Sequence, residues 1–546
     1  MSEVGTRPVP PGLTERDVDD AIERLTAALG ADRVITDPAE LREFRDPFQV
    51  QTSDDYAASA VVMPTTVEEI QAIVAIANET KVPLWTHGQG RNNGYGGPAP
   101  RVSGSIIVSL RNMNKVLEIN EKLGYAVVEP GVRWFDLYEA IKAGGHKLMV
   151  SIADLGWGSV VGNSLDNGAT YMPYGVDQAS WCGMEVVLPN GELMRTGMGA
   201  MPGNKAWHTY KRSLGPSADL LFTQSNYGIV TKMGYWLMPE PETYMPLWLR
   251  LPKDDDLAVA TDVMRTLMLD DTLRMNPQIM SGTLLAAVLS ERSKHWDDPN
   301  TPIPQDVLDR MGEEMGFGRW IMRFALYGDE AVVDHRYAKV KDAFESAIPG
   351  AAVWGSKYTP DQIADIEDPS ERVQGGVPSL DLNAMTGWYG GEQGGHIGFS
   401  PVLPMTGEDA LRVRDLMRRE MEASGLDYMA ALIPINARSM VHVTMVLFDT
   451  ASVEQSEKAY AACRRAVLAA AKEGYGEYRA HLDFMDLATE QYSFGDHAQR
   501  RFNETIKDAL DPNGILSPGK QSIWPARMRE LRASANGHNG SNGAGA

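Results

Sequence analysis

One glycine-rich stretch constrains the fold of this chain more than any other feature: residues 88–97 read GQGRNNGYGG. The stretch follows a predicted strand, VPLW, and its five glycines allow backbone amides to come close to a pyrophosphate. The Rossmann fingerprint also needs a helix that begins inside the glycine loop, and the glycines and prolines from Gly96 to Pro100 argue against that helix. A nicotinamide dehydrogenase is therefore disfavoured, which leaves either a different phosphate-binding loop or an ordinary glycine loop.

Two more stretches share this glycine-rich character. Residues 153–169 read ADLGWGSVVGNSLDNGA, and residues 223–231 read TQSNYGIVT. Three such stretches are more informative than one. Together they predict a large cofactor with an extended phosphate linker, wrapped by loops rather than bound at a single helix terminus.

The order of predicted elements indicates a mixed α+β fold. Residues 65–79 predict a helix with apolar side chains on one face, at positions 70, 73, 74 and 77, and Asn190-Gly191 between two apolar runs predicts a tight hairpin. After Pro239 and Pro241, long strands such as RWIMRFALYG alternate with amphipathic helices such as DALRVRDLMRREMEASG. We therefore expect a first domain at 1–241, a second at 242–473, a segment at 474–531 that completes the first domain and the site, and a disordered tail at 532–546.

The composition excludes several classes of function. The chain has 51 basic and 73 acidic residues, a formal charge of -22, so neither nucleic acid nor an anionic membrane is expected as a partner. Cys182 and Cys463 are too few for a disulfide framework or an all-cysteine metal site. Because the sequence shows no secretory signal and no run of about 18 apolar residues, we expect a cytoplasmic protein without a membrane span and without a metal ion.

A few reactive side chains stand in settings that leave their roles open. His396 lies in GGEQGGHIGFSP, where glycines leave the ring accessible, yet a lone histidine is more often structural than functional. Tyr478 and Arg479 either bind an anionic oxygen together or are a half-buried Tyr beside a surface Arg. Asp154 is either a functional carboxylate or a turn residue.

Seven collinear blocks resemble the vanillyl-alcohol oxidase and 4-alkylphenol oxidase family: RNNGYGGPAPRVSGS, DLGWGSVVGN, MEVVLPNGELMRTGMGAMPG, FTQSNYGIVTKMG, HIGFSP, GYGEYR and DPNGILSPGK. They cover roughly residues 45–525. The resemblance implies a two-domain flavoprotein, with an FAD-binding domain built from both ends of the chain and a central cap domain of antiparallel sheet and helices. It also implies a homodimer or a larger homo-oligomer.

The resemblance implies FAD as the cofactor, joined covalently to His396, because this histidine matches the family's H-x-x-F-[SA]-P block. The glycine-rich stretches, with two residues from later in the chain, are expected to bind the rest of FAD. These expected residues are Gly88, Gly90, Arg91, Asn92, Asn93, Gly94, Gly158, Ser159, Gly162, Asn163, Gly228, Ile229, Val230, Arg372 and Lys520.

By the same resemblance, Tyr95, Tyr478 and Arg479 match a trio that binds the oxygen of a para-substituted phenol as phenolate. A phenol has a pKa of about 10, so holding it ionised near pH 7 needs about 4 kcal/mol of preferential stabilisation. A hydride then passes from the benzylic carbon to the flavin and leaves a quinone methide. Asp154 matches the aspartate that stabilises this species and takes a proton from attacking water. Molecular oxygen reoxidises the flavin to give hydrogen peroxide, and the product is an alcohol, a carbonyl compound or an alkene.

The sequence departs from the family at several points. No histidine stands between Asp46 and Tyr56, where some members have one that promotes flavin attachment. Ser370 replaces an arginine, and Arg372 is the nearest candidate to substitute for it at the pyrimidine edge of the flavin. Ala153 stands where well-known oxidases have proline, so a flavin dehydrogenase with a quinone or cytochrome acceptor is the alternative to an oxidase.

Three residues are expected by analogy to line the substrate ring: Gly398, Leu432 and Pro434. A small residue at 398 leaves room for methoxy groups beside the phenolic oxygen, or serves strand packing alone. A non-catalytic flavin- or phenol-binding protein is the alternative from a different class. The joint presence of the phenol-binding trio, Asp154 and His396 argues against it.

Overall fold

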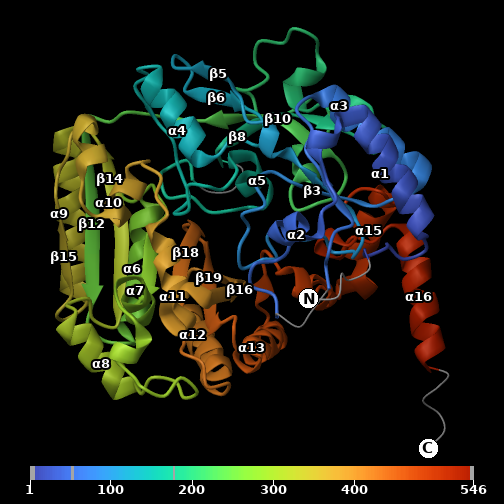
Figure 1. Ribbon diagram of the computed structural model, residues 1–546. Helices are drawn as coiled ribbons and strands as arrows, with labels where there is room; N and C mark the ends of the chain where they lie inside the picture. Colours follow the sequence, from blue (N-terminus) through green and yellow to red (C-terminus); the bar gives the residue numbers. More distant parts are fainter. Residues whose placement is uncertain (1–6, 51–54, 176–178, 541–546) are drawn as a thin grey trace, which may run out of the picture.

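The computed structural model describes residues 7–50, 55–175 and 179–540, and it confirms the predicted α+β class. Two smaller sheets are formed by strands between residues 34 and 236, and a nine-stranded sheet by strands between residues 243 and 477 (Figure 1). A short antiparallel pair joins β7 (Leu148–Met149), inside the first region, to β11 (Met238–Pro239), which lies between the two regions in sequence. No helix in the described ranges is long and apolar enough to cross a membrane.

The four-stranded sheet has the order β1 (Val34–Ile35), β2 (Ala60–Val62), β4 (Ile106–Ser109), β3 (Leu84–His87). β4 is parallel to both of its neighbours, and β1 is antiparallel to β2. Helices α1 (Glu15–Leu29) and α3 (Val67–Thr80) share one hydrophobic core with these strands. The predicted apolar face of α3, at positions 70, 73, 74 and 77, is buried in this core, which confirms the predicted helix.

The five-stranded sheet is antiparallel and has the order β5 (Val116–Asn120), β6 (Tyr125–Val128), β10 (Ile229–Trp236), β8 (Trp181–Val187), β9 (Leu193–Arg195). The hairpin between β8 and β9 turns at Asn190-Gly191, as predicted, and Gly191 has a φ of +85° that a residue with a side chain rarely adopts. Helices α4 (Trp134–Ala143) and α5 (Val160–Leu165) lie in the connection between β6 and β8.

The nine-stranded sheet is antiparallel throughout. Its order is β15 (Ala352–Gly355), β12 (Thr243–Leu251), β14 (Trp320–Gly328), β13 (Gln278–Ser281), β18 (Ala430–Asn436), β19 (Ser439–Asp449), β17 (Pro401–Pro404), β20 (Gly476–Glu477), and β16 (Gly394–Phe399) pairs with β19.

Both faces of this sheet are covered, so its strands are buried along most of their length. Leu247 and Leu249 of β12 pack in the core that includes α6 (Asp256–Leu269), α9 (Glu330–Ala347), α12 (Gly407–Glu422) and α13 (Val453–Lys472). Trp248, between them, points into a second core with α7 (Gly282–Leu289) and α8 (Gln305–Glu314). This alternation follows from the period of two in a strand. The remaining helices are α2 (Pro38–Leu41), α10 (Pro369–Gln374), α11 (Gly387–Gly390), α14 (Met485–Glu490), α15 (Phe494–Leu510) and α16 (Ala526–Gly540).

The C-terminal segment returns to the first sheets, where Leu531 of α16 lies against Gly12. The amide of Leu84 donates to the carbonyl of Ile515 at 2.7 Å, and the amide of Ser517 donates to the carbonyl of Leu84 at 2.7 Å. α16 (Ala526–Gly540) overlaps the predicted disordered tail at 532–546, which stays a prediction. Residues 541–546 of the predicted tail lie outside the described residues.

Candidate active site

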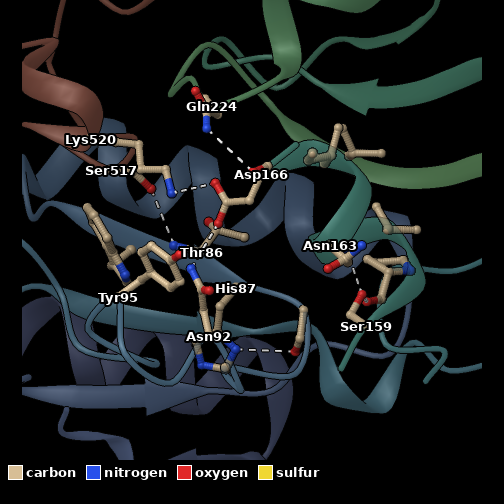
Figure 2. Close-up of a pocket in the computed structure, with 18 of the residues that line it drawn as sticks. Thr86, His87, Asn92, Tyr95, Ser159, Asn163, Asp166, Gln224, Ser517 and Lys520 are labelled. Atoms are coloured by element: carbon tan, nitrogen blue, oxygen red, sulfur yellow. Dashed lines mark hydrogen bonds and ion pairs between the residues drawn. The ribbon is translucent and has the colours of Figure 1, made fainter. Parts of the chain in front are cut away.

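A cavity lies where the three glycine-rich stretches meet the C-terminal segment (Figure 2). It encloses about 1430 Å³ of space free of protein atoms, part of it open to solvent. Most of the residues that the sequence assigned to FAD line this cavity, namely Gly88, Gly90, Arg91, Asn92, Gly158, Ser159, Gly162, Asn163, Gly228, Ile229, Val230 and Lys520. Asn93, Gly94 and Arg372 do not line it.

Glycine is required where the first two stretches meet. A Cβ atom on Gly88 would lie 2.7 Å from the carbonyl oxygen of Pro130 and 2.7 Å from the hydroxyl of Ser159. That hydroxyl accepts a hydrogen bond from the amide of Gly162 at 2.8 Å and so fixes the start of α5. The cavity wall is therefore backbone brought close by glycines, which suits an extended cofactor with a phosphate linker.

Asp166, at the end of α5, is a cavity residue that the sequence analysis missed. Its carboxylate accepts hydrogen bonds from Lys520 at 2.9 Å and from Asn92 at 3.1 Å (Figure 2). Burial alone would raise the pKa of Asp166, but Lys520 and Arg479 hold it below its usual value. This carboxylate therefore connects the end of α5 to the first glycine-rich stretch, through Asn92, and to the C-terminal segment, through Lys520. An aspartate next to Asn-Gly in a loop carries no local signal for that role.

The predicted phenol-binding trio is brought together beside this cavity. The guanidinium carbon of Arg479 lies 4.0 Å from the ring centre of Tyr95 and 5.4 Å from that of Tyr478. Tyr95 and Arg479 line the cavity, and the Nε of Arg479 is shielded without a hydrogen-bond partner. Burial raises the pKa of Tyr478, so its hydroxyl stays protonated and can donate. The trio thus offers a cation and hydroxyl donors to an oxygen anion.

Glu477, next to the trio on β20, was also missed. Its carboxylate accepts hydrogen bonds from the amides of Ser400, at 3.0 Å, and Arg479, at 3.1 Å. Burial raises the pKa of Glu477 to about 7, against the lowering effect of these amides. The side chain fixes the backbone that presents Tyr478 and Arg479.

His396 lies on β16, outside the cavity lining, with its ring against the backbone of Gly94. Its Nδ1 is buried and has no hydrogen-bond partner, and its ring contacts that of Phe48 with 5.2 Å between centres. Burial lowers the pKa of His396 to about 4, so the imidazole is neutral. A neutral ring with an unsatisfied buried nitrogen, next to the loop that lines the cavity, fits attachment to a cofactor held there.

A second histidine, His481, stands near His396 and contacts the segment 46–56, which itself has no histidine. His481 donates from Nε2 to the carboxylate of Asp46 at 3.1 Å, because its Nδ1 accepts from the amide of Asp483. Both side chains are buried, and both act electrostatically on His396. Asp46 in turn accepts from the amide of Phe48, the residue that packs on the His396 ring. Residues 51–54 of that segment lie outside the described residues.

Asp154 is buried at the junction between the two regions of the chain. One of its oxygens, Oδ2, accepts hydrogen bonds from Tyr171 and, at 2.6 Å, from Arg323 of β14. Neither partner was found from the sequence. Arg372, the predicted replacement for a family arginine at the flavin, donates to the carbonyl of Ile366 at 3.0 Å and lies 3.9 Å from the carboxylate of Asp381.

The strand register corrects the predicted substrate-ring residues. A Cβ on Gly398 would lie 3.6 Å from the hydroxyl oxygen of Tyr95, so Gly398 faces the trio. Leu432 and Pro434 point to the opposite face of the sheet, because Gly398 pairs with Met445 whereas Leu432 pairs with His442. The residues of β18 that share the face of Gly398 are Ala431 and Ile433. A shift of one residue along a strand exchanges its two faces, and the sequence alone did not settle that choice.

No group of three or more metal-ligating side chains occurs in the described parts of the chain. The comparisons with known proteins agree on a flavoprotein. The family described as FAD binding domain matches residues 58–197, and the family described as FAD linked oxidases, C-terminal domain, matches residues 414–521.

Full-length relatives are also found. The flavoprotein subunit of 4-cresol dehydrogenase (hydroxylating) from Pseudomonas putida is 35% identical over 528 residues, 96% of this chain and 99% of that protein. The structure of 4-ethylphenol oxidase from Gulosibacter chungangensis in complex with isoeugenol superposes with a TM-score of 0.91 at 39% identity, covering 95% of this chain and all of that one. The structure of p-cresol methylhydroxylase with substrate bound has a TM-score of 0.88 at 35% identity, covering 95% of this chain and 99% of that one.

Proposed function

The chain belongs to the vanillyl-alcohol oxidase and 4-alkylphenol oxidase family of FAD-dependent enzymes, and from this premise we propose that it oxidises para-alkylated phenols at the benzylic carbon. One observation carries the proposal: the Arg479 guanidinium lies over Tyr95 and beside Tyr478 at the wall of the cofactor cavity. The relatives that support it are named for 4-cresol and 4-ethylphenol.

The trio acts by holding the substrate as a phenolate. Arg479 supplies the positive charge, and the hydroxyls of Tyr95 and Tyr478 donate hydrogen bonds to the same oxygen. In a site with little water these interactions lower the pKa of the bound phenol by the three units or so that ionisation near pH 7 needs. The negative charge pushes electrons toward the para carbon, so a hydride can leave from the benzylic position.

FAD supplies the acceptor for that hydride when it is bound, and we propose that His396 holds it covalently. The substrate is left as a quinone methide. Asp154 then takes a proton from the water that adds to the benzylic carbon, which gives a benzylic alcohol. When water is kept away, loss of a proton from the next carbon gives an alkene instead.

We propose molecular oxygen as the final electron acceptor, with hydrogen peroxide as its product. The relative that is 39% identical is named an oxidase, which supports this choice. A quinone or cytochrome acceptor is the second candidate, supported by the relative that is 35% identical and named a dehydrogenase.

Anaerobic mixing of the holoenzyme with 4-ethylphenol in a stopped-flow instrument tests the proposal. We expect the flavin absorbance to bleach within seconds and to return with peroxide when oxygen is admitted. Return of colour only with a quinone or cytochrome would indicate the dehydrogenase, and no bleaching with any 4-alkylphenol would overturn the substrate class. Acid precipitation should leave the flavin on the protein and release it from His396→Ala. Light scattering of the same sample tests the predicted homo-oligomer.

A further inference from the structure

We propose that Arg323 is the positioning residue of the site: it holds Asp154 as a carboxylate and directs one carboxylate oxygen to the reacting atoms. The proposal rests on the proposed function, because it assigns the second partner of the residue that takes the proton from water. Arg323 belongs to the nine-stranded sheet, whereas Asp154 precedes α5, so the two halves of the chain supply one side chain each.

The two carboxylate oxygens of Asp154 differ in their hydrogen bonds. Arg323 Nη2 lies 2.6 Å from Oδ2, and the hydroxyl of Tyr171 donates to the same Oδ2. Within the described part of the chain no donor is found for Oδ1, and Oδ1 is not among the buried atoms that lack a partner. Oδ1 is therefore not fully shielded, and Asp154 lines a small cavity beside β13 and β14, whereas Oδ2 is fully occupied. A carboxylate arranged in this way can accept a proton on Oδ1 and keep the hydrogen bonds of Oδ2.

Arg323 is held in place independently of Asp154. Its Nε donates to the side-chain oxygen of Gln278 at 2.7 Å, and Gln278 is its direct cross-strand partner on β13. Its guanidinium carbon also lies 4.7 Å from the ring centre of Tyr171. Two contacts of the guanidinium are thus in place before the carboxylate is considered. Such preorganisation makes the cation effective, because little reorganisation is needed when charge develops nearby.

The surroundings keep this ion pair strong. Arg323 and Asp154 are 3% and 7% exposed, and both line a small cavity whose other walls include Met280, Leu284 and Val288. Charges attract more strongly where apolar side chains exclude water. Burial would lower the pKa of Arg323, but Asp154 and Tyr171 raise it above its usual value, so the guanidinium stays charged.

Loss of Arg323 would leave Asp154 buried without a cation, and a buried lone carboxylate takes up a proton. The protonated acid cannot accept another proton from water. Without its negative charge it also no longer stabilises the electron-poor quinone methide as that species forms, so hydride transfer to the flavin slows as well. The other titratable groups that face this pair are few: Tyr171, Asp368 at the start of α10, Asp381 in the same small cavity, and Tyr244 on β12. The two tyrosines stay neutral because burial raises their pKa, and the other two groups are acids. Among these groups Arg323 therefore supplies the positive charge beside Asp154.

The test compares Arg323→Gln and Arg323→Lys with the wild-type holoenzyme. Flavin reduction by 4-ethylphenol is measured from about pH 5 to pH 10, and infrared difference spectra report the carbonyl band of a protonated carboxylic acid. For Arg323→Gln we expect a carboxylic acid band at about pH 7 that disappears in the double variant with Asp154→Asn, and at least a 10-fold slower reduction at that pH. Arg323→Lys should restore most of the rate and remove the band.

The matched control is Arg292→Gln, which breaks another buried Arg–Asp pair of the same region, with Asp427 at 2.7 Å, away from the site. It should leave the pH profile of flavin reduction unchanged, and any carboxylic acid band that it produces at Asp427 should persist when Asp154→Asn is added. A wild-type pH profile in Arg323→Gln, or losses in Arg323→Gln and Asp154→Asn that simply multiply in the double variant, would overturn the proposal. If no 4-alkylphenol reduces the wild-type flavin, the proposed function fails, while the infrared band still decides the role of Arg323.

Discussion

Replacing Arg479 with glutamine removes the charge that the proposed mechanism depends on most. The guanidinium carbon lies 4.0 Å from the Tyr95 ring centre. A phenolate oxygen that accepts a hydrogen bond from the guanidinium would lie about 4 Å from its central carbon. Two unit charges at that distance attract by about 4 kcal/mol at an effective dielectric constant of about 20. This energy corresponds to about three pKa units. Lys520, held by Asp166 in the same cavity, supplies part of the missing charge. We therefore expect the pKa of the bound phenol to rise by about two units in Arg479→Gln.

A phenol without a benzylic carbon, such as 4-bromophenol, gives the direct assay because it binds without being oxidised. Its ionisation in the complex is followed by ultraviolet absorbance across the pH range, for the wild type and for Arg479→Gln. Arg438→Gln removes one unit of charge from an exposed turn outside the cavity and is the control for a general charge effect. A shift of less than about half a unit in Arg479→Gln, or an equal shift in the control, would show that Arg479 does not ionise the phenol.

Three further substitutions test other contacts of the site. Gly94→Ala puts a Cβ 2.5 Å from Nε2 of His396 at a φ of +81°, so the ring must move; acid-resistant flavin fluorescence on a denaturing gel should fall, and full attachment would contradict this reading. Asp166→Asn removes the anion between Lys520 and Arg479, so 4-bromophenolate should bind about 5-fold tighter, a gain of about 1 kcal/mol; weaker binding would mean that the carboxylate is mainly structural. Glu477 has a pKa of about 7 in the folded protein against 4.5 normally, so its stabilising effect is present below about pH 4.5 and is lost as the pH rises through 7. Between pH 4.5 and pH 8, Glu477→Gln should therefore gain about 3 kcal/mol in free energy of unfolding relative to the wild type. Thermal unfolding at both pH values measures this gain, and a constant difference would contradict the raised pKa.

The parts of the fold that were predictable depend on short stretches of sequence. The apolar face of α3 repeats every three or four residues, and Asn190-Gly191 selects a tight turn whatever surrounds it.

The site was predictable only for residues that stand in a recognisable sequence block. Tyr95, Tyr478 and Arg479 are recognisable from their blocks, and the structure brings them together. Arg323 meets Asp154 across 169 positions, and Lys520 meets Asp166 across 354. No periodicity or local motif encodes such pairs, because they exist only after the strands and loops have packed. The misplaced Leu432 and Pro434 show the same limit within one strand, where the partner strand decides which face points to the site.

The charges at the site explain how an acidic protein can bind an anion. The chain carries a formal charge of -22, which disfavours the approach of a phenolate from solution. Around the cavity, however, Arg91, Arg479 and Lys520 outnumber Asp166 by two positive charges, and Arg323 and Asp154 cancel each other. A phenol is neutral at pH 7, since its pKa is about 10, and so it meets no repulsion on the way in. Its ionisation inside then supplies a negative charge that the local positive excess favours. The trio therefore selects a substrate that enters neutral and can ionise, which distinguishes phenols from carboxylates, already charged outside, and from aliphatic alcohols, which do not ionise at all near neutral pH.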